Sequence, residues 1–196
     1  VASDPMGATL KKDYPQVEEF VRFYASGGAK QIKKGDQYIY ESAVVHADST
    51  LFNVFTLPAI QGDTRTALNE PNTVVISAAA AKKYFETTNA IGKVLEADGT
   101  PYKVTGVIRD MPGNSHFVAD FIFSMDNVDY NWGQYLSHNH QTYILLKAGT
   151  DPKAFEKNFK QYIEKYVVPQ ARQVMSINSM EEFEKSGNKL EYSLIP

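Results

Sequence analysis

The stretch TVVISAAAAKKYF, residues 73 to 85, joins a compact β-branched run to a run of alanines. Residues 73–77 predict a buried strand, because β-branched side chains favour the extended backbone. Ser77 is a typical N-cap for the helix predicted over 78–86. In that helix Ala81, Tyr84 and Phe85 share one face. The stretch therefore predicts a strand that leads directly into a helix.

Strands outnumber helices on both sides of this unit. Predicted strands cover 17–24, 30–48 as a hairpin around Gly35-Asp36, 56–63, 93–111 as a hairpin around DGTP, 116–124, 141–149 and 189–195. Predicted helices cover 5–13 with Asp4 as N-cap, 49–55 with Asp48 as cap, 78–86, a segment starting at Pro152 with Asp151 as cap, and 178–186. The two types mix without strict alternation, which favours an α+β fold over a doubly wound sheet.

The segment after Asp151 gives the strongest helical signal. An apolar stripe at helical spacing consists of Phe155, Phe159, Tyr162, Ile163 and Tyr166. We expect this stripe to pack on the strands at 17–24 and 141–146, which would join the two ends of the chain. Breaks in character near residues 47 and 138 predict two lobes, one of residues 1–46 and 138–196 and the other of the inserted residues 47–137.

Composition narrows the class of protein. The 196 residues are 43% hydrophobic and 22% charged, with a net charge of −3, as in an ordinary folded domain. Lys and Arg are scattered, so nothing favours nucleic acid as a partner. The chain has no cysteine, which excludes disulfides and thiolate metal sites. It lacks an initiator Met and ends abruptly, so we interpret it as a segment of a longer protein.

The stretch RDMPGNSHF, residues 109 to 117, holds the ingredients of a hydrolytic triad. Asp110, Ser115 and His116 lie close together in the chain around Pro112-Gly113, whereas the members of a triad usually come from distant positions. The simpler interpretation is a turn whose polar side chains bond backbone groups. A hydrolase that uses Ser115 and His116 remains the alternative.

Two further patterns have a chemical and a structural interpretation. The sequence HNH places His138 and His140 on one face of an extended segment, where His116 could join them as a metal ligand, but no neighbouring carboxylate completes the set. Aromatic residues concentrate in the middle of the chain, where they could line a groove for a sugar or lipid or fill the core. These aromatic residues are Phe121, Phe123, Tyr130, Trp132, Tyr135 and Tyr143.

Several strings in fixed order then resemble one family. The strings are ADSTLFNVFTLPAIQGDTRTALNEPNTVVISAAAAKKYF (47–85), AIGKVL (90–95) and YKVTGVIRDMPGNSHFVADFIFS (102–124). Together they resemble the MacB-like periplasmic core domain of FtsX-like ABC transporter permeases. The flanking strings at 10–24 and 142–166 are also similar to that family.

The resemblance implies a two-lobed fold: a porter-like lobe from both chain ends and a mixed α+β lobe inserted between them. It implies a non-enzymatic periplasmic domain that couples cytoplasmic ATP hydrolysis to periplasmic movement or export (mechanotransmission). The implied partners are a second permease subunit, held through membrane helices outside this segment, and a cytoplasmic ATP-binding subunit. A periplasmic partner protein is a further possibility. The family offers no catalytic residue, cofactor or metal ligand to carry over to this sequence. A small-ligand or lipid-binding domain remains a third alternative.

Overall fold

The described strands form a ten-stranded mixed sheet with few helices packed against it, which confirms the α+β class. The structure is a computed structural model that describes residues 1–24, 28–175, 179–185, 187 and 189–195. Along the sheet the strand order is β10-β1-β4-β9-β6-β8-β7-β2-β3, and β5 pairs with β8.

The strands are β1 (Val17–Tyr24), β2 (Lys30–Lys34), β3 (Gln37–Glu41), β4 (Val44–Ala47), β5 (Ala59–Gln61), β6 (Thr73–Ser77), β7 (Val94–Ala97), β8 (Thr100–Ile108), β9 (Phe121–Ser124) and β10 (Gln141–Leu146). The helices are α1 (Met6–Asp13), α2 (Leu51–Val54), α3 (Ala78–Phe85), α4 (Pro152–Glu156), α5 (Asn158–Tyr162), α6 (Val168–Met175) and α7 (Met180–Lys185). Two short helical turns complete the described elements, η1 (Met125–Asn127) and the π-helical η2 (Ile163–Val167).

The unit of β6 and α3 lies in the middle of the sheet. All five residues of β6 are buried between β8 and β9, which explains its unbroken apolar pattern. The Ser77 hydroxyl accepts a hydrogen bond from the Ala80 amide at 3.0 Å, so the predicted cap is confirmed. The helix ends at Phe85, and its C-cap residue Glu86 adopts a left-handed conformation with φ of 59°.

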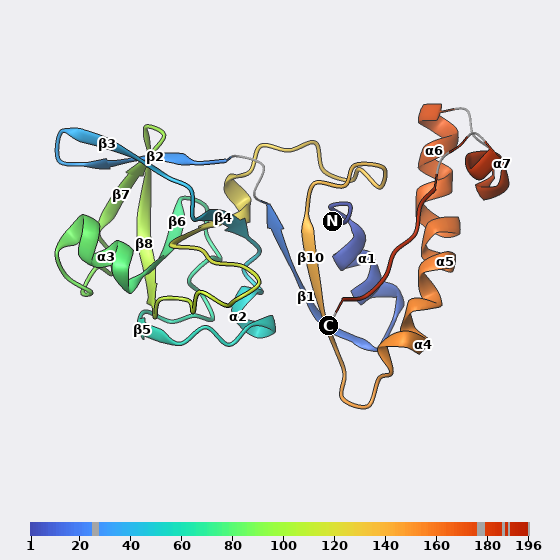
Figure 1. Cartoon of the computed structure of the whole chain (residues 1–196), viewed down its shortest axis with the longest axis horizontal. Coiled ribbons are helices and arrows are strands. Elements are labelled where there is room, and N and C mark those ends of the chain that lie inside the picture. Colours follow the sequence, from blue (N-terminus) through green and yellow to red (C-terminus); the bar gives the residue numbers. More distant parts are fainter. Residues whose placement is uncertain (25–27, 176–178, 186, 188, 196) are drawn as a thin grey trace.

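The elements divide into two groups in space (Figure 1). One group holds β2 to β9 with α2 and α3, and the other holds β1 and β10 with α1 and α4 to α7. Among the described strands, the two groups are connected within the sheet by β1 and β4, which pair at two positions, Phe23 with Ala47 and Tyr24 with His46. We call the group with β2 to β9 the hairpin half and the group with β1, β10 and most of the helices the helical half. The hairpin of β2 and β3 lies in the hairpin half, where Ile32 pairs with Ala97 of β7.

The segment from Pro152 to Met175 is helical throughout but changes its winding. Asp151 caps it, as predicted, by accepting a hydrogen bond from the Lys153 amide at 2.9 Å. The π-helical turn η2 precedes Pro169, which has no amide hydrogen and whose ring would clash with the carbonyl of Lys165 in a regular helix. The wider turn lets the helix continue past the proline.

The predicted stripe on this helix is buried, but its main partner differs from the expected one. Phe155, Phe159, Tyr162 and Ile163 are 0–6% exposed. They pack with Met6 and Leu10 of α1, and in Figure 1 helix α1 lies between the long helix and strands β1 and β10. The strands contribute Val17 at the start of β1, and Ile144 and Leu146 of β10, to this cluster. The expected direct packing on β1 is therefore mostly replaced by packing on α1.

Some local predictions are wrong. Residues 189–195 form no strand; instead Leu190, Tyr192 and Leu194 pack as an irregular segment against the long helix. Residues 116–120 are also irregular, and the strand starts only at Phe121. Asp4 and Asp48 do not cap helices with their side chains, because other backbone groups engage both carboxylates. The first and last residues of the helix predicted over 178–186, Asn178 and Ser186, lie outside the described residues. Residues between them form α7.

Candidate functional site

The stretch from Arg109 to Phe117 connects β8 to β9 and does not assemble a triad. The Asp110 carboxylate accepts a hydrogen bond from the Ala79 amide in the first turn of α3, at 2.8 Å. The Ser115 amide donates to the Pro112 carbonyl at 2.9 Å, which closes the turn. The exposed His116 ring contacts aromatic rings, with its centroid 4.9 Å from that of Phe117. Among the residues that the structure describes, no hydrogen bond joins Asp110, Ser115 and His116, which supports the turn interpretation.

Replacing His116 by Ala should change the free energy of unfolding by no more than about 0.5 kcal/mol, because its side chain is exposed and the contacts it loses are at the surface. Urea melts of the two proteins measure the difference. A loss above about 2 kcal/mol would show that the ring is part of the folded core and that the turn interpretation is incomplete.

The two histidines of HNH have different surroundings. His138 Nε2 lies 2.7 Å from the Tyr192 hydroxyl. His140 is fully buried, and its ring contacts Tyr24 and Tyr130, each with a centroid distance of 5.1 Å. Within the described ranges no group of three or more His, Cys, Asp or Glu side chains is placed to hold a metal ion.

The aromatic residues in the middle of the chain are divided among several clusters. Phe121 and Phe123 belong to the core beneath α3, and Tyr143 packs on the core beneath α2. Tyr135 stacks on Tyr166 of the long helix at 5.4 Å. Trp132 is 40% exposed and contacts Tyr130 and His140. These side chains therefore lie in several separate clusters and do not line one groove.

A shallow groove lies between the long helix and the C-terminal segment. Its volume is about 240 Å³, and Phe159, Ile163 and Tyr192 form its apolar floor. The pKa of the Tyr192 hydroxyl is raised to about 12, chiefly because burial disfavours its charged form. Glu156, Lys160, Glu184 and Glu191 surround the floor. This mixed rim offers a lipid tail only a small apolar area, so it gives the ligand-binding alternative little support.

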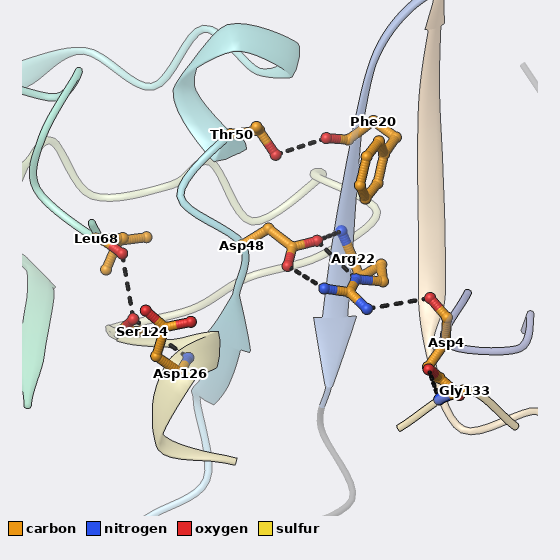
Figure 2. Close-up of polar contacts among 9 residues, drawn as sticks. All are labelled: Asp4, Phe20, Arg22, Asp48, Thr50, Leu68, Ser124, Asp126 and Gly133. Carbon is orange, nitrogen blue, oxygen red and sulfur yellow. Dashed lines mark hydrogen bonds and ion pairs between the residues drawn. The ribbon is translucent and has the colours of Figure 1, made fainter. Parts of the chain in front are cut away.

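The most extensive partly buried polar arrangement described lies where the two halves meet, at Arg22 of β1 (Figure 2). The Arg22 guanidinium donates to both oxygens of Asp48, Nε to Oδ2 at 2.9 Å and Nη2 to Oδ1 at 2.7 Å. The Arg22 backbone amide also donates to Asp48 Oδ2 at 2.7 Å. Both side chains are mostly shielded from water, at 18% and 13% exposed. Such a bidentate pair fixes both position and angle, so it ties the chain after β4 to β1.

A second carboxylate extends this arrangement towards the N-terminus. Arg22 Nη1 donates to the Asp4 carbonyl at 3.1 Å. The Asp4 carboxylate accepts from the backbone amides of Gly133 and Gln134, at 2.7 and 2.9 Å. The Arg22 guanidinium also lies over the Trp132 ring at 5.0 Å. We call Asp4, Arg22, Asp48 and the 132–134 segment the junction, because they join four separate stretches of chain between the halves (Figure 2).

Two buried histidines border the junction. His46 of β4 is 8% exposed and lies against Tyr24 and Phe123. Burial lowers its pKa to about 4, and the positive charge of Lys30 adds to this effect. His140 also has a lowered pKa, because burial and then the nearby Arg22 disfavour its charged form. Both rings are therefore neutral at neutral pH, and the positive charge at the junction stays on Arg22.

Lowering the pH should destabilise the domain before its carboxylates titrate. His46 keeps a low pKa in the folded state but has a pKa near 6.5 when unfolded, so acid first protonates the unfolded chain. The contribution of His46 is present above pH 6.5 and is lost as the pH falls towards 4. We expect a loss of about 2 kcal/mol between about pH 7 and pH 5.

Chemical denaturation at a series of pH values measures this loss. The His46→Phe variant keeps a ring at this position and removes the titration, so its stability should fall less over the same range. If both proteins show the same pH dependence, His46 is not the group that titrates.

The sequence showed only part of this junction. The sequence pattern predicts Asp4 and Asp48 as caps of the nearest helices and Arg22 as a polar position in an alternating strand. One signal was available: Arg22 is a lone cation in a strand with both faces partly covered, and a half-buried cation needs a partner. The identity of that partner depends on how β1 and β4 meet.

Solved structures of membrane permease domains share this fold. A domain described as part of a permease protein from Porphyromonas gingivalis is 21% identical, with a TM-score of 0.80, and the match covers 100% of this chain and 79% of that one. The periplasmic region of MacB from Actinobacillus actinomycetemcomitans is 14% identical, with a TM-score of 0.60 over 97% of this chain and 86% of that one. The extracellular domain of the noncanonic ABC-type transporter YknZ from Gram-positive bacteria is also 14% identical, with a TM-score of 0.58 over 100% and 90%.

The fold is the one found in the extracytoplasmic domains of ABC transporter permeases. The family model of the MacB-like periplasmic core domain matches residues 2–162, so the chain belongs to this family. The resemblance read from the sequence is thereby confirmed, and with it the periplasmic location of the domain. Comparison with curated proteins gives no match. None of the described helices has the length and apolar character required to cross a bilayer.

Proposed function

We propose that this domain transmits movement from cytoplasmic ATP hydrolysis to the periplasm, and that the junction is the place where its two halves move relative to each other. The observation that carries the proposal is the small number of strand pairs that connect the halves within the sheet. Among the described strands two residue pairs, Phe23–Ala47 and Tyr24–His46, bridge them, and the Arg22–Asp48 pair braces this point. Val21 and Phe23 of β1 also pack in the apolar cluster beneath α2, so movement of the halves would shift packed side chains as well as bend the sheet.

The positions of the chain ends support attachment through one half. Val1 and the C-terminal segment both lie in the helical half (Figure 1). We propose that membrane helices extend from this half and that a cytoplasmic ATP-binding subunit drives them. In this proposal the lobe of residues 1–46 and 138–196 is membrane-proximal and the lobe of residues 47–137 is moved, with β4 moving with the latter because it pairs with β9. The described β2–β3 hairpin would then move with the inserted lobe, since it pairs with β7.

A reversible lock at the junction tests this proposal in the full permease with its ATP-binding subunit. The chain has no cysteine, so the double variant Tyr24→Cys/His46→Cys can form only one disulfide within it. These residues face each other across β1 and β4, within the range that a disulfide spans. Spin labels attached through unnatural amino acids at Asp36 and Lys157 report the distance between the halves.

The expected result is that ATP changes this distance in the reduced protein, that oxidation abolishes the change, and that reduction restores it. A matched control pair, Val94→Cys/Lys103→Cys, places a disulfide between β7 and β8 within the hairpin half and should leave the change intact. The proposal would be contradicted if ATP left the distance unchanged in the reduced protein, or if ATP still changed it in the oxidised protein.

We propose further that the domain has no catalytic activity. Support comes from the loop of residues 109–117, where Asp110 is bonded to α3 and His116 packs on aromatic rings. Screening the purified domain with generic ester and peptide substrates tests this. Turnover that disappears in Ser115→Ala would establish the hydrolase instead.

A thermal-shift screen with lipids, sugars and peptides tests the ligand-binding alternative, since a ligand of the native state raises its melting temperature.

We propose that the second permease subunit is held mainly through membrane helices, and that the isolated domain is monomeric or only weakly dimeric. Tethering raises the effective concentration of weak contacts to about millimolar, and its loss should dissociate them. Light scattering at micromolar concentration should give the mass of one chain. A tight dimer under these conditions would contradict this part of the proposal. Pull-down with the full permease tests whether a periplasmic partner protein binds the domain.

A further inference from the structure

The strand β3 forms one end of the described sheet, and its outer edge has no neighbouring strand there. It belongs to a tight hairpin whose two-residue turn, Gly35-Asp36, has Gly35 at φ of 59°. Two large side chains project from its outer face, Tyr38 at 52% exposed and Tyr40 at 69% exposed. The opposite face is covered, because Glu41 bonds to Lys83 and Tyr84 of α3. An edge strand with exposed aromatic residues can accept another strand.

The register of the hairpin determines which backbone groups are free. Gln31 of β2 pairs with Tyr40, yet its backbone groups bond to Asp98 on the other side of β2. Gln31 and Tyr40 therefore form a non-hydrogen-bonded pair, and the amide and carbonyl of Tyr40 point away from β2. Two residues earlier, Tyr38 has the same orientation. The free edge thus presents the donors and acceptors of Tyr38 and Tyr40.

The sequence of β3, QYIYE, is nearly palindromic around Ile39. In an antiparallel pair of two copies centred on Ile39, Tyr38 of one copy would lie opposite Tyr40 of the other. The outward groups of these residues would then make about four backbone hydrogen bonds. Gln37 would lie opposite Glu41, so no like charges oppose each other at the ends of the pair. The strand is therefore complementary to itself.

We propose that β3 is a contact between two copies of this chain, formed by antiparallel pairing of the two β3 edges around Ile39. A contact of five residues from each copy is far smaller than the ~1,200–2,000 Å² that stable complexes bury, so it is weak in isolation. The contact becomes populated when the two copies are held near each other, which rests on the membrane tethering proposed above. The pairing itself depends only on β3.

Single-cysteine variants of the isolated chain test the register at a concentration of about 1 mM, close to that of a tethered pair. In the proposed pair the Cα atoms of Tyr38 and of Tyr40 in the other copy lie about 5.5 Å apart, within disulfide range. Two copies of Tyr38→Cys would instead be separated by about 8 Å, from the rise and spacing of strands. A mixture of Tyr38→Cys and Tyr40→Cys should therefore form its mixed disulfide at least about fivefold faster than either variant forms its own.

A second variant tests the contact without cysteine chemistry. Tyr38→Lys/Tyr40→Lys places lysines opposite each other across the pair. The change also removes the hydrogen bond from Tyr38 to Glu96 and places a lysine opposite Lys33, so circular dichroism first checks that the variant folds. Sedimentation equilibrium at high concentration should show weak association of the unsubstituted chain and its loss in the lysine variant. Equal disulfide rates in all three samples, or association that survives the lysines, would overturn the proposal. These outcomes do not depend on ATP, so they are distinct from a failure of mechanotransmission.

Discussion

Replacing Phe159 by Ala should lower the free energy of unfolding by about 3–5 kcal/mol. Phe159 is 4% exposed and lies at the centre of the cluster that joins the long helix to α1. Its ring meets Phe155 and Tyr192 edge to face, each at 5.9 Å. Truncation removes these contacts and leaves a cavity that the packed rings around it cannot fill. The loss is a large share of the ~5–15 kcal/mol that stabilises a typical domain.

Urea melts of the purified domain measure this change. Val174→Ala is a matched control, because Val174 lies further along the same helical segment but is 70% exposed. Its effect should stay within about 0.5 kcal/mol. If the two variants unfold at the same urea concentration, the helical stripe does not form the core of the helical half.

Removing the guanidinium of Arg22 should have the second largest effect. Arg22→Ala leaves the Asp48 carboxylate with only a backbone amide partner at a site where its side chain is 13% exposed. It also removes the donor to the Asp4 carbonyl and the contact over Trp132. A buried charge without a partner costs more free energy than the ion pair contributed. We therefore expect the free energy of unfolding to fall by about 2–4 kcal/mol, which is less than for a fully buried pair because these side chains are partly exposed.

The companion variants separate charge from geometry. Arg22→Lys keeps the charge but not the planar fork, so it should recover only part of the stability. Arg22→Ala combined with Asp48→Ala should lose less than the sum of the single variants, because the pair then leaves no orphaned charge. Lys185→Ala, in an ion pair whose side chains are 72% and 75% exposed, should change little. Additive losses would show that Arg22 and Asp48 stabilise the junction independently.

The elements best predicted from the sequence are those determined by neighbouring residues. The β6–α3 unit was correct because a β-branched run and a serine cap act within one or two turns of chain. The two hairpins were correct for a similar reason, since Gly35 and the Asp98-Gly99 pair take the positive φ angles that tight turns require. The strand predicted at 189–195 was wrong, because an alternating pattern becomes a strand only if another strand offers an edge. In the helical half these residues meet a helix.

The sequence by itself determined the α+β class, the family and the buried face of the long helix, since periodicity and capping are properties of adjacent residues. Only the tertiary structure decided how these elements meet. It placed α1 between the long helix and the strands, and it gave Asp4 and Asp48 backbone and arginine partners in place of helix caps. A carboxylate bonds whichever donors the fold brings within about 3 Å. Arg22 and Asp48 are separated by 26 positions in the chain, and the distance between them depends on how β1 meets β4.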